Sequence, residues 1–245
     1  MLLSEQSSQK GKLTALPDIL PGEFVSALAI PPNLRQFVRS RAEQGSRQFI
    51  PQARTPQKTA RIATLTLEQI SFLKGRTVLD NVTHPYELAG LHCQIANRLA
   101  DQLLRQLGLE REENQLPERL HPVQQLKLRL GCAIAHNPVL LVLEDSFDAI
   151  DPSLRNPLLA NFLDLWERER PSVLHFTTRP DDALLLADRI LLPSGSSKLL
   201  AEFKPPFPRP RNLGLLEESE FAALKARLSA SLFLTNAAFE PEYFI

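Results

Sequence analysis

Glycine is scarce in this sequence. The chain has 9 glycines among 245 residues, against 20 prolines, whereas an average soluble protein contains about 7% glycine. Loops that wrap phosphate groups are rich in glycine because their backbone must approach the ligand closely. The scarcity therefore argues against an intact loop of that kind.

Cysteine, net charge and long apolar runs are also lacking. Cys93 and Cys132 are the two cysteines; they form no disulfide framework, and no histidine or cysteine lies near them at the spacing of a zinc site. Basic and acidic residues both number 28, so no excess charge points to nucleic acid. No stretch approaches the roughly 18 apolar residues of a membrane span, and the N-terminus does not read as a signal peptide. We expect a chain of the reducing cytoplasm.

Apolar strand patterns alternate with helical ones along most of the chain. Strands are expected at 22–30, 61–67, 139–145, 172–178 and 189–193, and helices at 92–107, 122–135, 158–170 and 181–188. Such alternation predicts a parallel sheet covered by helices on both faces. Gly108 is the expected stop signal of the helix at 92–107.

Two further segments stand outside this alternation. Residues 35–61 carry seven basic residues against one acid, a local charge of +6, which fits either a solvated face or a docking patch for an acidic partner. Residues 204–211, KPPFPRPR, indicate a proline-rich linker. An apolar stripe of Phe221, Leu224, Leu228 and Leu232 follows on a C-terminal helix.

The stretch LPERLHPVQQLKLRLGCAIAHNPVLLVLEDSFDAIDP resembles ATP-binding-cassette (ABC) ATPases from the signature motif to the D-loop. HFTTRPDDALLLADRI at 175–190 is similar to the H-loop segment, RTVLDNVTHPYELAG at 76–90 to the piece after the Q-loop, and PGEFVSALAIPPNLRQF at 21–37 to the strand and Walker A loop. The tail resembles that of nitrate-, sulfonate- and bicarbonate-type importer ATPases. The resemblance implies a P-loop NTPase-like α/β core at 1–203, with a helical subdomain at about 83–137, and a linker and C-terminal helix at 204–245.

The Walker A loop of the family, G-x-x-x-x-G-K-[ST], cradles phosphate with backbone N–H groups, a lysine and a metal-binding hydroxyl. The glycine positions correspond here to Ala29 and Leu34, the lysine to Arg35 and the hydroxyl to Gln36. Pro31 and Pro32 lack N–H donors. The loop is therefore not expected to hold ATP in the family's manner.

The signature motif L-S-G-G-Q corresponds to Leu120-His121-Pro122-Val123-Gln124, with proline and valine where the family has small residues beside phosphate. Walker B acids correspond to Glu144 and Asp145, in reversed order, and the Q-loop glutamine to Glu68. The catalytic histidine of the H-loop falls on Thr178, while the D-loop Asp151 is kept. His175 reads as a core residue rather than a displaced catalyst.

These departures together predict a non-catalytic protein, with no ATP or Mg²⁺ bound and no catalytic, cofactor or metal residue in use. Its expected role is to pair with an intact ABC ATPase or to dock on a transporter's membrane subunit, which would bring it to the inner face of a membrane. One alternative is a stand-alone regulatory or assembly factor. The other is an importer ATP-binding subunit with residual ATPase activity that uses Glu144, Asp145 and Arg35.

Two surfaces are candidates for the partner site. The first is the basic segment, where Arg39, Arg41 and Arg47 are expected to be exposed. The second is the region after Arg76, with more apolar contacts around Val78, Val82 and Tyr86.

Overall fold

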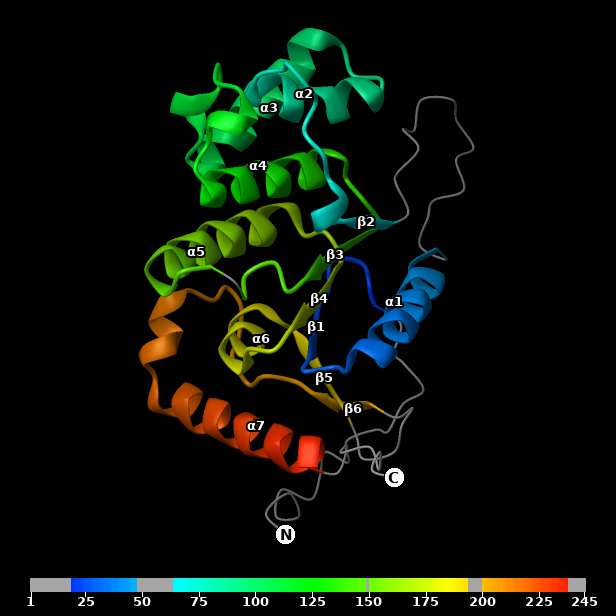
Figure 1. The fold of residues 1–245 in the computed structure, drawn as a ribbon, viewed down its shortest axis with the longest axis vertical. Coiled ribbons are helices and arrows are strands. Elements are labelled where there is room, and N and C mark those ends of the chain that lie inside the picture. Colours follow the sequence, from blue (N-terminus) through cyan, green and yellow to red (C-terminus); the bar gives the residue numbers. More distant parts are fainter. Residues whose placement is uncertain (1–18, 48–63, 149, 194–199, 238–245) are drawn as a thin grey trace, which may run out of the picture.

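Six strands form one sheet in the described part of the chain, which comprises residues 19–47, 64–148, 150–193 and 200–237 of a computed structural model (Figure 1). The strand order is β2-β3-β4-β1-β5-β6, and all neighbours pair in parallel except β5 with β6. The strands are β1 (Phe24–Leu28), β2 (Thr64–Thr66), β3 (Leu140–Glu144), β4 (Val173–Thr177), β5 (Arg189–Pro193) and β6 (Leu200–Phe203).

Side chains of each central strand enter two different apolar layers. In β3, Leu140 and Val142 pack with Val38 and Ala42 of α1 (Pro32–Arg47). Leu141 and Leu143 belong to the core on the opposite face, which includes α5 (Pro152–Glu169) and α6 (Pro180–Leu186). The period of two in a strand explains why a continuous apolar run is buried on both faces.

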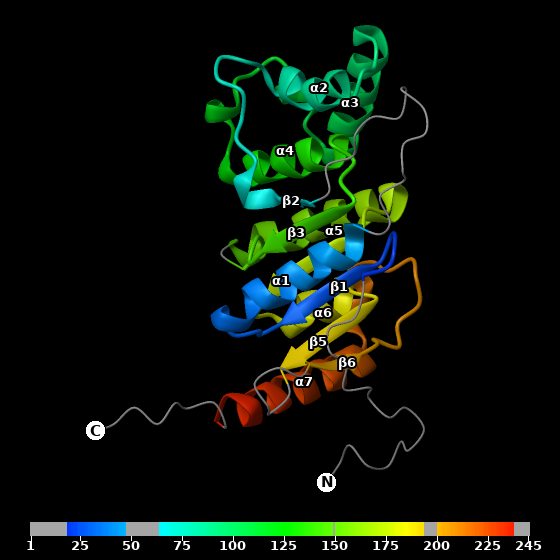
Figure 2. The ribbon, with the colours of Figure 1, turned by 90° about the vertical axis from the view of Figure 1, so that its right-hand side faces the viewer.

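A layer of helices lies at one end of the sheet, beyond β2, and packs against α5 (Figures 1 and 2). It contains α2 (Val78–Leu88), α3 (Cys93–Leu107) and α4 (Pro122–Ala135), together with short 3₁₀ turns at Leu67–Gln69, Glu110–Glu112 and Pro117–Arg119. Its own apolar cluster includes Leu104, Leu128 and Leu165, the last contributed by α5. Because other residues of α5 belong to the core against the sheet, this helix joins the helical layer to the sheet.

Local sequence signals fix the ends of these helices. Thr77 and Asp80 form a reciprocal capping box at the start of α2, which satisfies two N–H groups that the helix leaves open. Gly108 follows α3 with φ 65°, in the left-handed conformation that glycine adopts without strain.

The C-terminal segment packs against the same core as the sheet. Phe207 and Phe221 have rings 5.6 Å apart, and both belong to the main apolar cluster together with Leu228 of α7 (Ser219–Ala237). A 3₁₀ turn at Leu213–Glu217 connects the proline-rich segment to α7. The division of the chain at residue 204 stays a prediction.

The predicted α/β class, with a mainly parallel sheet covered on both faces, is confirmed. Three elements were not predicted as such: α1 within the basic segment, α2, and the antiparallel β6. α5 begins six residues before the predicted helix, because Asp151 accepts hydrogen bonds from the N–H (2.9 Å) and Oγ (2.5 Å) of Ser153 and caps the helix there. Residues 48–63 of the basic segment lie outside the described residues.

Candidate functional site

The two acids of the candidate Walker B segment lie where β3 ends. Glu144 is the last residue of β3, and Asp145 follows with φ 52°, a conformation that Asp tolerates better than most residues. The N–H of Asp145 donates to the carbonyl of Phe176 in β4 (3.0 Å). The carboxyl edge of a parallel sheet is the usual place for a ligand in α/β proteins.

Arg35, at the predicted lysine position, reaches this acid pair from the first turn of α1. Both of its terminal nitrogens bind the two carboxylate oxygens of Asp145, with Nη2 3.1 Å from Oδ1. Its Nε donates to the carbonyl of Ile30 (3.2 Å). The residue at the predicted lysine position thus meets one of the two acids in a bidentate ion pair.

Arg39 is a member of the site that the motif comparison missed. Its Nη1 lies 3.0 Å from Oε1 of Glu144, its Nη2 2.7 Å from Oγ1 of Thr66, and its Nε 3.0 Å from Oε1 of Glu43. The available signal was its spacing: four residues after Arg35, it falls on the same face of a helix. The expectation that Arg39 is exposed is wrong, because its side chain is 28% exposed and these contacts hold its guanidinium.

Glu68, at the predicted Q-loop position, also contacts the acid pair. Its Oε1 accepts from the backbone N–H of Glu144 (3.3 Å) and from the hydroxyl of Ser146. Burial raises the pKa of Glu68, while the hydrogen bond from Ser146 acts in the opposite direction.

The loop between β1 and α1 offers few donors for phosphate. The N–H of Ala29 (φ 51°) donates to Thr177, and the N–H groups of Leu34 and Arg35 donate to the carbonyl of Pro31 (2.9 and 3.1 Å). Gln36 is exposed on the next position of α1. These three N–H groups are therefore engaged within the chain, and Pro31 and Pro32 have none to offer.

The residues at the signature position cap their own helix. Pro122 is the first residue of α4. The backbone N–H of Val123 donates to Nδ1 of His121 (3.4 Å), and the backbone N–H of His121 donates to Oε1 of Gln124 (3.0 Å). The helix predicted there is confirmed. In this arrangement the N–H of Val123 is engaged within the chain.

Thr178, at the predicted histidine position, is held by another acid. Its N–H and hydroxyl both bind Oδ2 of Asp148, at 3.1 and 2.8 Å. His175, by contrast, is fully buried beside the rings of Phe24 and Phe147 (5.9 and 5.7 Å between centroids), and burial lowers its pKa to about 4. The core placement predicted for His175 is confirmed.

Mg²⁺ does not fit the acid pair in this arrangement. The carboxylates of Glu144 and Asp145 already bind guanidinium groups, and Gln36 supplies no hydroxyl. Within the described ranges, no group of three or more His, Cys, Asp or Glu side chains is placed to hold a metal ion.

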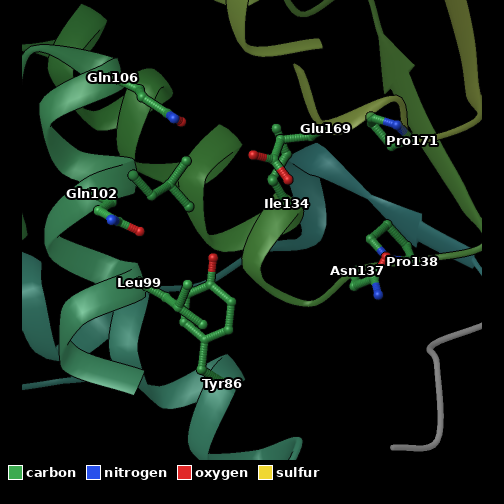
Figure 3. Close-up of a pocket in the computed structure, with 10 residues that line it drawn as sticks. Tyr86, Leu99, Gln102, Gln106, Ile134, Asn137, Pro138, Glu169 and Pro171 are labelled. Atoms are coloured by element: carbon green, nitrogen blue, oxygen red, sulfur yellow. The ribbon is translucent and has the colours of Figure 1, made fainter. Parts of the chain in front are cut away.

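Two cavities lie elsewhere in the helical layer. One, of about 310 Å³, is found near the N-terminal ends of β3 and β4, the opposite edge from the acid pair; Tyr86, Gln102 and Glu169 direct polar atoms into it (Figure 3). The other has a volume of about 450 Å³, and its lining residues come after Glu68 in the sequence: Leu73, Lys74, Arg76, Asp80, Thr83, His84, Glu87 and Asn97.

The second predicted partner surface needs a correction. Val78 and Val82 are fully buried in the apolar cluster of the helical layer, so they cannot contact a partner. Tyr86 is half-buried and lines the smaller cavity.

The fold is that of ABC ATPase cassettes: a P-loop NTPase-like α/β core with a layer of helices at one end. The chain is similar in structure to the cbiO1 subunit of the cbiONQ ABC transporter complex of Clostridium perfringens, with a TM-score of 0.60 over 91% of this chain and 92% of that chain, at 14% identity. No protein-family model matches.

The sequence relatives carry the names of ATP-binding proteins, one of them of an ABC transporter. An uncharacterised one from Methanocaldococcus jannaschii is 28% identical over 158 residues, 64% of this chain and 59% of the relative. The nitrate import ATP-binding protein of Synechococcus elongatus is 27% identical (66% and 61%), and the taurine import ATP-binding protein of Shigella flexneri is 29% identical (68% and 68%). The matched part of the chain thus covers less than two thirds of the length of the first two of these relatives.

These relatives contradict one prediction. The altered motifs predict a protein without ATPase activity. Its relatives carry the names of ATP-binding transporter subunits, a class of ATPases, so the expectation of a non-enzyme is wrong. None of the helices in the described ranges is long and apolar enough to cross a membrane.

Proposed function

We propose that this chain is the ATP-binding subunit of an ABC importer for small polar solutes and works with a membrane-embedded subunit. The observation that carries the proposal is the ion pair of Arg35 with Asp145, beside Glu144, at the carboxyl edge of a mainly parallel sheet. The similarity to nitrate and taurine import ATP-binding proteins supports the choice of importer.

Arg35 is the residue that would receive a nucleotide phosphate. A guanidinium binds carboxylate and phosphate oxygens with the same bidentate geometry, so a phosphate can replace Asp145 as its partner. The side chains of Arg35 and Asp145 are 25% and 39% exposed, which leaves the pair open to an entering anion. Exchange of one anionic partner for another keeps the guanidinium paired throughout.

The departures from the Walker A motif are expected to lower the affinity of this site for nucleotide. The prolines before α1 and the internal hydrogen bonds of Leu34 and Arg35 leave few N–H groups for phosphate. We propose that the isolated chain binds nucleotide weakly for this reason, and that assembly with the transporter is the state in which nucleotide is used.

The cavity of about 450 Å³ is the proposed contact for the membrane subunit. Its lining begins at Leu73, five residues after Glu68 in the sequence. Glu68 itself contacts Ser146 and the backbone N–H of Glu144. A partner segment seated there would be linked to the site through this one acidic side chain. Its lining carries charges of both signs, including the exposed side chains of Lys74 and Glu87.

Copurification tests the proposal. The full chain, tagged and extracted from its own cells in mild detergent, is expected to bring down an integral membrane protein. Glu87→Arg should weaken this recovery, whereas Glu110→Arg, at an exposed glutamate of the same helical layer outside the cavity, should leave it unchanged. A chain that purifies without any integral membrane protein would overturn the proposal.

A further inference from the structure

Arg39 connects three elements at the acid pair. From the second turn of α1 it reaches Thr66 at the end of β2 and Glu144 at the end of β3, and it also binds Glu43 one turn further along its own helix. All three guanidinium nitrogens therefore have partners within 3.0 Å. An arginine with this many directed contacts fixes the position of the carboxylate it binds.

Arg35 and Arg39 divide the two acids between them. Arg35 takes both oxygens of Asp145, and Arg39 takes Oε1 of Glu144. The two carboxylates are thus matched in charge by two guanidinium groups carried on successive turns of one helix. A divalent cation at the same acids would meet this positive charge at close range.

We propose that Arg39 is a positioning residue that acts through Glu144 and, together with Arg35, holds the acid pair closed to divalent cations until the ion pairs open. The inference rests on the proposed function, because it assigns regulation to the same site. It also explains why acids at the Walker B position do not fit Mg²⁺ in this arrangement.

The exposure of the pairs makes the closure reversible. The side chains of Arg39 and Glu144 are 28% and 37% exposed, so solvent reaches both. Ion pairs at such positions are weak and sensitive to salt. The pairs therefore bias the site toward the closed state and can be displaced by a ligand that binds the acids more strongly.

Mn²⁺ titration of the full-length protein, followed by electron paramagnetic resonance, tests the closure directly. We expect Arg39→Gln to bind Mn²⁺ about tenfold more tightly than wild type, because one positive charge leaves and Glu144 is released. Combined Arg35→Gln and Arg39→Gln substitution should tighten binding further. Arg39→Lys, which keeps the charge but not the three-way contact, should fall between wild type and Arg39→Gln.

Arg41→Gln is the matched control. Arg41 lies on the same helix, is exposed, and contacts Gln44 at 3.5 Å, so its loss changes net charge equally without releasing an acid. Equal Mn²⁺ affinity in wild type and Arg39→Gln, or equal tightening by Arg41→Gln, would overturn the proposal. If the double variant does not fold, the single variant, which keeps the Arg35–Asp145 pair, decides.

The titration uses neither nucleotide nor a membrane subunit. Failure to copurify a membrane protein would therefore remove the proposed function and leave the Mn²⁺ result standing. Conversely, an unchanged Mn²⁺ affinity in Arg39→Gln would remove the closure while the importer assignment stands.

Discussion

Charge pairing between a helix and a strand end determines the chemistry available at the site. Arg35 and Arg39 lie four residues apart and meet Asp145 and Glu144, which are adjacent in sequence. The side chains come from segments about 110 residues apart, and only the parallel pairing of β1, β4 and β3 brings those segments to one edge.

Sequence reasoning predicted part of this constellation. Arg35, Glu144 and Asp145 could be found because each stands at a position that the motif comparison singles out. Arg39 and Thr66 could not, because neither belongs to a motif and their contact depends on how α1 crosses the sheet. Helical spacing from Arg35 was the available clue, and it required knowing that a helix begins at Pro32.

His175 gives a residue-scale prediction about pH. Burial lowers its pKa from 6.5 to about 4, so between these values the unfolded chain binds a proton that the folded chain does not. Stability should therefore fall as pH decreases through this window, by about 1.4 kcal/mol per pH unit. From pH 7 to pH 5 the contribution of His175 is about 2 kcal/mol.

Urea unfolding of wild type and His175→Phe at the two pH values measures this contribution. Phenylalanine keeps an aromatic ring between Phe24 and Phe147 but does not titrate. The variant should lose less stability between pH 7 and pH 5 than wild type. The same loss in both proteins would contradict the assignment of this pH dependence to His175.

Element boundaries followed from caps and breakers where those signals are local. Gly108 and the proline at the start of α4 gave correct ends for α3 and α4. β6 was missed because it pairs antiparallel at the edge of the sheet, and β-pairing depends on a distant partner rather than on its own four residues. α1 was not predicted because it lies in the basic segment, and a run of basic residues occurs both on solvated helices and in loops.

Arg211 shows how the C-terminal elements are joined to the core, and it gives a prediction at this scale. Its Nη1 donates to carbonyls of Leu184 (3.0 Å) and Ala187 (2.8 Å) at the end of α6, and its Nε to Phe207 (3.0 Å). Arg211→Met should leave these buried carbonyls without a donor and cost about 3 kcal/mol in the free energy of unfolding.

Hydrogen–deuterium exchange locates the effect. Faster exchange is expected in α6 and in residues 204–232 of the Arg211→Met variant. Arg227→Met, at an exposed position on α7, serves as the control and should exchange like wild type. An Arg211→Met protein with unchanged exchange and stability would show that the C-terminal segment does not depend on this contact.

At the scale of the whole molecule, the fold is that of ABC ATPase cassettes, and the loop between β1 and α1 offers few N–H donors for phosphate. Isothermal titration calorimetry of the isolated chain with MgATP should therefore show very weak binding or none, because the loop at 29–36 lacks glycines and Arg35 is already paired. A Mg²⁺-dependent affinity in the micromolar range would contradict this account of the loop.

The measurement that bears most directly on the account is ATP hydrolysis by the complex copurified with the full-length chain. Wild type is compared with the Glu144→Gln, Asp145→Asn variant, after confirming that both recover the same membrane protein. If this chain is the ATP-binding subunit, hydrolysis should fall on the order of a hundredfold in the variant, as expected when groups that act on the reaction are removed. An intact complex whose hydrolysis is unchanged by the substitutions would contradict the assignment of ATP use to this chain.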